Sequence, residues 1–348
     1  MFKIGKREIG PGRPVFIVAE VSGNHNGDIK RALEIIDAAA DAGADAVKLQ
    51  TYTPDTMTIR SDRDEFIVKS NPVWKGKTLY ELYEWAHTPW EWHEKLFAHA
   101  KKRGLICFST PFDETAVDFL EKFRVPAYKV ASFEIVDVPL LERIGKTKKP
   151  VIMSRGMASL DEIRTALKTL RKAGTKDIVL LHCVSAYPAK PEDMNLATIP
   201  DIAQRFDVLS GLSDHTLGTE IAVASVALGA RVIEKHVTLK RADGGPDAAF
   251  SLEPEELALL VRSVRTVEAS LGKPTYTRSA DEKKNAVFRR SLYVVQDIKK
   301  GERFTKENVR SIRPGYGLAP KYYKHVLSKR AKQDIKRATP LGRAHVAL

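Results

Sequence analysis

Eight short apolar segments recur between residues 15 and 239, and they constrain the fold more than any other feature of the sequence. Each is six to eight residues long and carries polar or charged residues at or just past its end. Near-continuous apolar runs of this length are typical of parallel strands that are covered on both faces. The segments span residues 15–21, 46–51, 105–111, 127–133, 150–156, 178–184, 208–213 and 232–239.

Helical periodicity separates these segments. Several of the intervening stretches stop at a glycine, a residue favoured just past the end of a helix. One stretch opens with Ser159 and Glu162 at the spacing of a capping box. The clearest helical patterns cover residues 29–42, 90–103, 159–172 and 254–271. Strands and helices that alternate in this way predict an α/β protein with a (β/α)8 TIM barrel.

The character of the sequence changes after the last predicted helix. Residues 273–286 form a polar connector, and residues 287–348 contain short β-like pieces and turns. A weak internal repeat, QDIK, occurs at residues 296–299 and again at residues 333–336. We therefore expect a barrel over residues 1–272, a linker, and a small β-rich C-terminal domain.

Composition favours a folded cytoplasmic protein. Hydrophobic residues make up 43% of the chain and charged residues 29%, and no apolar run approaches the ~20 residues that a membrane span needs. The N-terminal stretch lacks the apolar core of a signal peptide. Cys107 and Cys183 lie inside apolar segments and form no CxxC pair, as expected of buried thiols in a reducing compartment.

The formal net charge of +13 raises the question of an anionic partner. We expect the excess of basic residues to be spread along the chain, with a concentration after Lys283. No DNA- or RNA-binding motif is visible. We interpret basic runs such as Lys299–Lys300 and Lys329–Arg330 as solvated faces. No specific nucleic acid partner and no membrane contact are expected.

Polar or charged residues follow the carboxyl end of every predicted strand, which is where a (β/α)8 barrel carries its active site. Residues two apart share a side of a strand, so Ser213 faces the same way as His215, and Glu234 the same way as His236. Two imidazoles that meet suit a divalent metal. The lysines and hydroxyls of the same ring suit a phosphate-bearing substrate. The rest of the ring consists of Glu20, Asn24, His25, Lys48, Gln50, Ser109, Thr110, Lys129, Ser132, Ser154, Ser185 and Tyr187.

Two loops at this end of the barrel are unusual. Residues 52–89 form a long insertion, and the region up to residue 92 contains all four tryptophans. Long loops above an active site often serve as lids or substrate walls, and a local satellite core or a subunit contact is the alternative. Residues 241–247 contain two adjacent glycines and end in Asp247, which we expect to reach substrate hydroxyls.

Six motifs along the barrel resemble those of the sialic acid synthase family, the enzymes that make nonulosonic acids. They are VAEVSGNHNGD (18–28), VKLQTY (47–52), FSTPFD (108–113), YKVASFE (128–134), GLSDHTLG (211–218) and IEKHVTL (233–239). Residues 289–302 and 309–318 resemble the antifreeze-like SAF domain of that family. Residues 77–93 and 182–188 look most like its pseudaminic acid synthase branch. Arg155, in SRGM, departs from the more usual STGM.

The resemblance implies roles for individual residues. His215 and His236 would bind Mn²⁺ or Mg²⁺, and Glu20 and Glu234 would serve as acid/base and positioning carboxylates. Arg313 resembles the arginine that a partner subunit inserts over the active site, which implies a domain-swapped homodimer. The implied phosphoenolpyruvate site consists of Lys48, Thr110, Lys129, Ser132, Ser154 and Ser213, and the remaining substrate-binding positions are Ser185, Tyr187 and Asp247.

The resemblance also implies the reaction, a condensation of phosphoenolpyruvate with an N-acetylated amino sugar. In the pseudaminic branch the acceptor is 2,4-diacetamido-2,4,6-trideoxy-altrose. One alternative is an N-acetylneuraminate or legionaminic acid synthase that uses N-acetylmannosamine or a related sugar. A non-catalytic carbohydrate- or ice-binding protein and a basic nucleic-acid-binding barrel are the other two, and the intact lysine and histidine set argues against the former.

Overall fold

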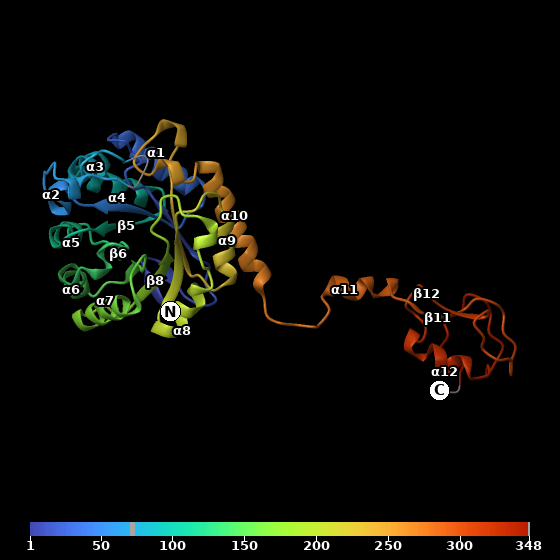
Figure 1. Ribbon diagram of the computed structural model, residues 1–348. Helices are drawn as coiled ribbons and strands as arrows, with labels where there is room; N and C mark the ends of the chain where they lie inside the picture. The colour runs from blue at the N-terminus through green and yellow to red at the C-terminus, as the bar shows by residue number, and fades with distance from the viewer. Residues whose placement is uncertain (70–73, 347–348) are drawn as a thin grey trace. The chain divides into compact units, whose positions relative to one another are not determined.

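The computed structural model describes residues 1–69 and 74–346. The chain divides into two compact units, Met1–Gly272 and Lys273–Leu348 (Figure 1). The first unit is a barrel and the second is a small β-rich domain.

Eight parallel strands form a closed barrel in the first unit, as the recurring apolar segments predict. Each strand pairs with the next in chain order, and the last one closes the ring by pairing with the first. Almost every residue of these strands is buried, which explains their continuous apolar pattern. The strands are β3 (Phe16–Glu20), β4 (Ala46–Thr51), β5 (Ile106–Pro111), β6 (Tyr128–Val130), β7 (Val151–Ser154), β8 (Ile178–Cys183), β9 (Leu209–Asp214) and β10 (Val232–His236).

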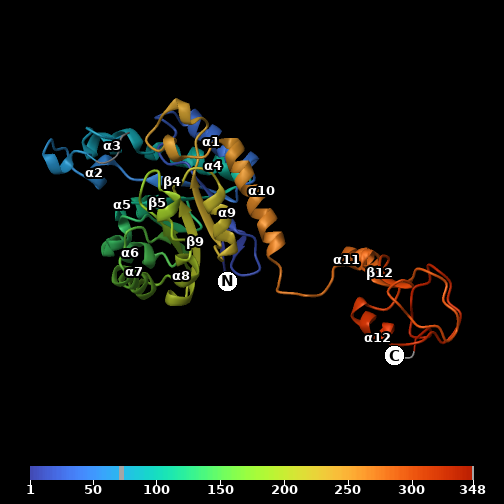
Figure 2. The same ribbon diagram turned by 45° about the vertical axis from the view of Figure 1, so that its right-hand side comes forward.

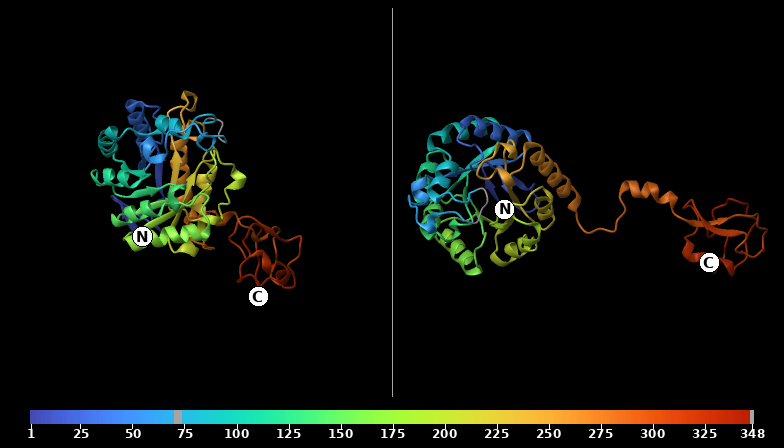
Figure 3. Two further views of the ribbon diagram at one scale, coloured as in Figure 1. Left: turned by 60° about the vertical axis from the view of Figure 1, so that its left-hand side comes forward. Right: turned by 45° about the horizontal axis from the view of Figure 1, so that its top comes forward.

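Helices surround the strands of the barrel (Figure 3). The predicted capping box forms at α7 (Leu160–Ala173), where the Ser159 hydroxyl accepts from the Glu162 N–H at 3.3 Å and the Glu162 carboxylate accepts from the Ser159 N–H at 2.7 Å. Gly174 ends this helix at φ +129°, which glycine adopts without strain. The other helices are α1 (Ile29–Asp41), α2 (Pro54–Met57), α3 (Leu79–Ala86), α4 (His93–Lys102), α5 (Glu114–Glu121), α6 (Val138–Lys146), α8 (Thr198–Phe206), α9 (Glu220–Ala227) and α10 (Pro254–Leu271).

A short antiparallel hairpin precedes the barrel, formed by β1 (Phe2–Ile4) and β2 (Arg7–Ile9). The sequence pattern does not predict it, because three-residue strands are too short to show an alternation. Ile4 and Ile9 are buried in one cluster with Phe16 and other residues from the beginnings of the barrel strands. The N-terminus lies at the end of the barrel opposite α2 and α3 (Figure 2). This apolar cluster closes the end of the barrel at which the strands begin. A site for a ligand is therefore expected at the other end, where the strands finish.

The second unit contains the antiparallel strands β11 (Ser291–Val294) and β12 (Val309–Ile312), and the helices α11 (Ala280–Lys284) and α12 (Tyr323–Leu327). The two QDIK copies pair with each other through their isoleucines. The aspartate of each copy forms an ion pair with the lysine of the other, at 3.1 and 2.9 Å. The weak repeat in the sequence is therefore a reciprocal structural contact.

The positive charge is concentrated in the second unit. It holds 20 of the 57 lysines and arginines but only 6 of the 44 aspartates and glutamates. The expected concentration after Lys283 is therefore confirmed, whereas the expected spread over the rest of the chain is wrong, since the barrel is close to neutral. Within residues 1–69 and 74–346, no helix combines the length and apolarity that a bilayer crossing requires.

Candidate active site

A cavity of about 220 Å³ lies at the carboxyl ends of the barrel strands. Residues from β4, β6, β7, β8, β9 and β10 line it, and the residues predicted at the ends of β3 and β5, Glu20 and Thr110, are not part of the lining. The residues of the predicted polar ring that line the cavity, together with the predicted loop carboxylate, are Lys48, Gln50, Lys129, Ser132, Ser154, Tyr187, Ser213, His215, Glu234, His236 and Asp247.

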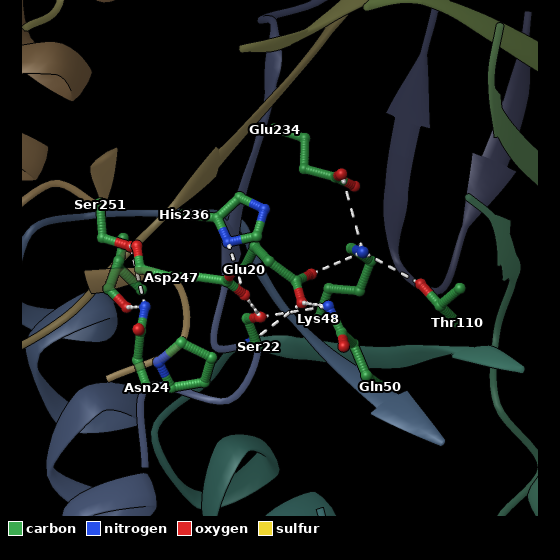
Figure 4. Close-up of polar contacts among 12 residues, drawn as sticks. Glu20, Ser22, Asn24, Lys48, Gln50, Thr110, Glu234, His236, Asp247 and Ser251 are labelled. Atoms are coloured by element: carbon green, nitrogen blue, oxygen red, sulfur yellow. Dashed lines mark hydrogen bonds and ion pairs between the residues drawn. The ribbon is translucent and has the colours of Figure 1, made fainter. Parts of the chain in front are cut away.

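Lys48 lies at the centre of a buried charged cluster (Figure 4). Its Nζ is 2.6 Å from Oε2 of Glu20 and 3.6 Å from Oε1 of Glu234. It also donates a hydrogen bond to Oγ1 of Thr110 at 3.0 Å. Burial lowers the pKa of Lys48, but the two carboxylates outweigh burial and the net shift is upward. Lys48 therefore stays protonated.

Lys129 is a second buried ammonium, and its hydrogen-bonding capacity is barely used. Among the described residues, its Nζ donates only to the carbonyl of Val130, at 3.1 Å. Oε1 of Glu234 lies 3.6 Å away, which is an ion-pair distance and too long for a hydrogen bond. Burial lowers the pKa of Lys129. An anion that entered the cavity would pair with this ammonium and favour its charged form.

The two carboxylates of the cluster are shifted in opposite directions. Burial raises the pKa of Glu20, and the nearby Lys48 offsets only part of that increase. Burial acts in the same sense on Glu234, but Lys129 and Lys48 outweigh it and lower its pKa. Ser213 supports the charged form by donating to Oε1 of Glu234 at 3.2 Å. Carboxyl groups with pKa values pushed apart are suited to separate acid/base and electrostatic roles.

His215 and His236 face each other, with ring centroids 5.3 Å apart. Nδ1 of His215 donates to the carbonyl of Val184 at 3.0 Å, which leaves Nε2 as a lone-pair nitrogen. Nδ1 of His236 is buried and has no hydrogen-bond partner within residues 1–69 and 74–346, and Oδ2 of Asp247 is 3.8 Å from it. In the described part of the chain, no group of three or more His, Cys, Asp or Glu side chains is arranged to hold a metal. The described residues therefore supply two imidazoles as possible ligands of a metal ion.

The predicted hydroxyl groups fall into two sets. Oγ of Ser154 is buried in the cavity wall, and among the described residues it has no hydrogen-bond partner, so it is available to a ligand. Oγ of Ser185 lies 2.9 Å from Oγ of Ser132, and only Ser132 lines the cavity. Thr110 contacts Lys48 and does not line the cavity itself. Contact of Ser185 or Thr110 with a substrate therefore stays a prediction.

The long insertion after β4 forms an aromatic wall of the cavity. Trp74 is the tryptophan that lines it, and the indole N–H donates to the carbonyl of Pro246 at 2.8 Å, in the predicted glycine loop. Trp74 also packs on Tyr187, with ring centroids 5.9 Å apart. Trp90, just beyond the insertion, instead stacks on Phe119. Trp74 therefore lines the cavity, whereas a role of the insertion as a substrate wall, a satellite core or a subunit contact stays a prediction.

Glu134 is a cavity residue that the sequence reading did not single out. It follows β6 in the motif YKVASFE, so its place after a strand end was the available signal. Its Oε2 is sealed from solvent and finds no hydrogen-bond partner in the part of the chain that the structure describes. Burial raises the pKa of Glu134 to about 7. Glu134 can therefore exchange a proton near neutral pH.

Arg155, the residue at which the sequence differs from the usual STGM motif, does not reach the cavity. Its guanidinium donates to Nδ1 of His182 at 2.9 and 3.2 Å and to the carbonyl of Gly156 at 3.2 Å. The cavity lining does not include Arg155. Arg313 follows β12 in the second unit, and its approach to a partner's active site stays a prediction.

The structure is that of a (β/α)8-barrel enzyme. The barrel is closed, and buried lysines, carboxylates and imidazoles converge on one cavity at the carboxyl ends of its strands. The NeuB family model matches residues 35–276, and the SAF domain model matches residues 289–347. The chain belongs to the NeuB family, which confirms the resemblance seen in the motifs.

Named relatives agree with this membership. The chain is 47% identical to the pseudaminic acid synthase of Campylobacter jejuni over 93% of this chain and 94% of the relative. It is 44% identical to the pseudaminic acid synthase of Helicobacter pylori over 95% of this chain and 97% of the relative. Among solved structures, the N-acetylneuraminic acid synthetase of Leptospira borgpetersenii matches with a TM-score of 0.73 at 35% identity, over 82% of this chain and 94% of that one.

Proposed function

We propose that this enzyme is a pseudaminic acid synthase, which condenses phosphoenolpyruvate with 2,4-diacetamido-2,4,6-trideoxy-altrose and releases phosphate. Its family and its high identity to two pseudaminic acid synthases support this reaction. The acceptor would react as its open-chain aldehyde, and the new bond would join the aldehyde carbon to C3 of phosphoenolpyruvate.

The barely used ammonium of Lys129 is the observation that carries the proposal. A buried cation with a single hydrogen bond is costly unless an anion completes its surroundings. Phosphoenolpyruvate brings a phosphate and a carboxylate to the cavity. Lys48 and Lys129, with the free hydroxyl of Ser154, supply charge-assisted donors to these groups.

The proposed chemistry assigns a task to each carboxylate. C3 attacks the aldehyde carbon, the aldehyde oxygen takes the electron pair of its double bond and is protonated, and water adds at the C2 cation that results. The bond between C2 and the bridging oxygen then breaks, so C2 becomes a ketone and phosphate leaves with that oxygen. Of the two water protons, one ends on the former aldehyde oxygen and the other on the phosphate. Glu20 would accept the proton of the attacking water, because its raised pKa makes it a stronger base than an exposed glutamate. Glu234 would stay charged and keep both lysines in place.

We further propose that His215 and His236 hold a divalent ion. The free Nε2 of His215 and the unpartnered buried nitrogen of His236 fit this role. Imidazole ligands favour Mn²⁺ over Mg²⁺, because Mg²⁺ prefers oxygen ligands. When bound, the ion supplies Lewis-acid polarisation of the aldehyde oxygen.

The apolar part of the cavity wall supports a deoxygenated acceptor. Met57, Trp74 and Leu82 line the cavity on the side of the long insertion. A 2,4,6-trideoxy sugar presents a methyl group where a hexosamine has a hydroxymethyl group. Apolar side chains contact a methyl group without leaving a hydroxyl unpaired.

We include a homodimer and a cytoplasmic location in the proposal. Both cysteines are free and buried, as expected in a reducing compartment. The partner's Arg313 would complete each active site. An Arg313→Ala chain mixed with a Lys48→Met chain would then regain activity, because one site in the mixed dimer contains both native residues. Absence of regained activity in verified mixed dimers would exclude the exchange of Arg313.

Replacement of Lys129 by Met tests the proposed phosphoenolpyruvate site. Loss of its charge should raise the KM for phosphoenolpyruvate at least about tenfold, the usual scale for a charge-assisted hydrogen bond. Lys168→Met, at an exposed position on α7, is the matched control and should leave the KM unchanged. An unchanged KM in both variants would remove Lys129 from the proposed site.

A further inference from the structure

Ser22 has a backbone conformation that an L-residue adopts at a cost. Its φ is +49°, in the left-handed region where glycine is favoured. It lies two residues after the end of β3 and is only 2% exposed. Strained residues persist where the surrounding contacts hold them, and they gather at functional sites.

The side chain of Ser22 connects two of the predicted site carboxylates (Figure 4). Its hydroxyl donates to Oδ2 of Asp247 and accepts from the side-chain amide of Gln50 at 3.2 Å. The same amide donates to Oε1 of Glu20 at 3.1 Å, and the Ser22 N–H donates to that oxygen at 3.0 Å. A glycine would satisfy the backbone at this position, but it would remove the hydroxyl that contacts Asp247.

Asp247 needs such support because it comes from a loop. It precedes the short turn Ala248–Phe250 in the loop after β10, and it lines the cavity. Its backbone carbonyl accepts from the Ser251 hydroxyl at 2.7 Å. The contact with Ser22 ties its carboxylate to the end of a barrel strand, which is a more rigid element than a loop.

We infer that Ser22 is a positioning residue that holds the carboxylate of Asp247 in place for the hydroxyl groups of the acceptor sugar. Ser22 does not line the cavity among the described residues, so it acts through Asp247. This inference rests on the proposed function, in which the acceptor sugar contacts Asp247. The inference gives a role in acceptor binding to the chain of hydrogen bonds that runs from Glu20 through Gln50 and Ser22 to Asp247.

The Ser22→Gly variant separates this role from a structural one. Glycine removes the hydroxyl and relieves the backbone strain, so Tm should stay within about 2 °C of the native value. The KM for the acceptor sugar should rise about tenfold, the scale of a lost hydrogen bond to a charged group. The KM for phosphoenolpyruvate should change less than about twofold, because that substrate contacts other residues.

Two further variants complete the experiment. Arg124→Gly relieves a similar φ of +52° at an exposed position and should change neither KM. Ser22→Ala keeps the strain, loses the hydroxyl, and should share the higher acceptor KM. An unchanged acceptor KM in both Ser22 variants, or equal changes in the two KM values, would overturn the inference.

The KM measurements on the Ser22 variants can also fail independently of the proposed function. If the native enzyme uses N-acetylmannosamine in place of the diacetamido sugar, the proposed acceptor is wrong. The same KM values measured with N-acetylmannosamine then decide the role of Ser22: a selective rise supports it, and no rise overturns it.

Discussion

Glu134 provides a quantitative test of the electrostatics of the cavity. Its Oε2 is sealed from solvent and unpartnered, and burial raises its pKa from 4.5 to about 7. We consider the Glu134→Gln variant, which keeps the shape of the side chain and removes its titration. Comparison with the native enzyme isolates the free-energy cost of ionising this one carboxyl group in the folded state.

The size and sign of the effect follow from proton linkage. Below pH 4.5 the carboxyl is protonated in both the folded and the unfolded chain, so its ionisation costs nothing. Between pH 4.5 and about 7 the unfolded chain releases its proton first, and the native free energy of unfolding falls. A shift of about 2.5 pKa units corresponds to ~3.4 kcal/mol, which is fully present above pH 7.

Thermal unfolding between pH 5 and pH 8 measures this effect. The difference in Tm between the Gln variant and the native enzyme should grow in favour of the variant by ~5 to 10 °C. About 2.5 kcal/mol of the effect develops between pH 5 and pH 8, and a large domain shifts by about 2–4 °C per kcal/mol. Glu142→Gln, at an exposed position on α6, is the control and should show no such trend. A Tm difference independent of pH for Glu134→Gln would refute the raised pKa of Glu134.

Three other predictions concern the residues around the site. Lys235→Met leaves the buried carboxylate of Asp214 without its partner at 2.8 Å, and it should destabilise the barrel by about 3–5 kcal/mol in unfolding experiments; a loss below about 1 kcal/mol would contradict this. His236→Ala should abolish turnover while circular dichroism stays native, and normal activity at trace metal would refute the metal assignment. Arg155→Thr should change the KM for phosphoenolpyruvate less than about twofold, because Arg155 bonds His182 outside the cavity; a larger change would place it in the phosphate site.

Most of the fold can be predicted from the sequence because its signals are local and repeated. The eight apolar runs predict the eight barrel strands, and the capping box at Ser159 forms as expected. The N-terminal hairpin is missed because its strands have three residues each. It is held by long-range burial of Ile4 and Ile9 in the base of the barrel, which no local pattern records.

The candidate site is predictable where the strand register alone decides the geometry. Residues two apart on β9 and β10 share a face, so the sequence brings Ser213, His215, Glu234 and His236 together correctly. Glu134 is missed, because its importance comes from burial without a partner. The strain at Ser22 is equally hidden, since a serine in sequence carries no sign of a left-handed backbone.

Phosphate release from phosphoenolpyruvate, measured with Mn²⁺ and two acceptors in parallel, is the most direct test of the central claim. One acceptor is 2,4-diacetamido-2,4,6-trideoxy-altrose and the other is N-acetylmannosamine. We predict release with the diacetamido sugar and little with N-acetylmannosamine. Preferential release with N-acetylmannosamine would contradict the pseudaminic assignment, and release with neither sugar in the folded, metal-loaded enzyme would contradict the proposed reaction.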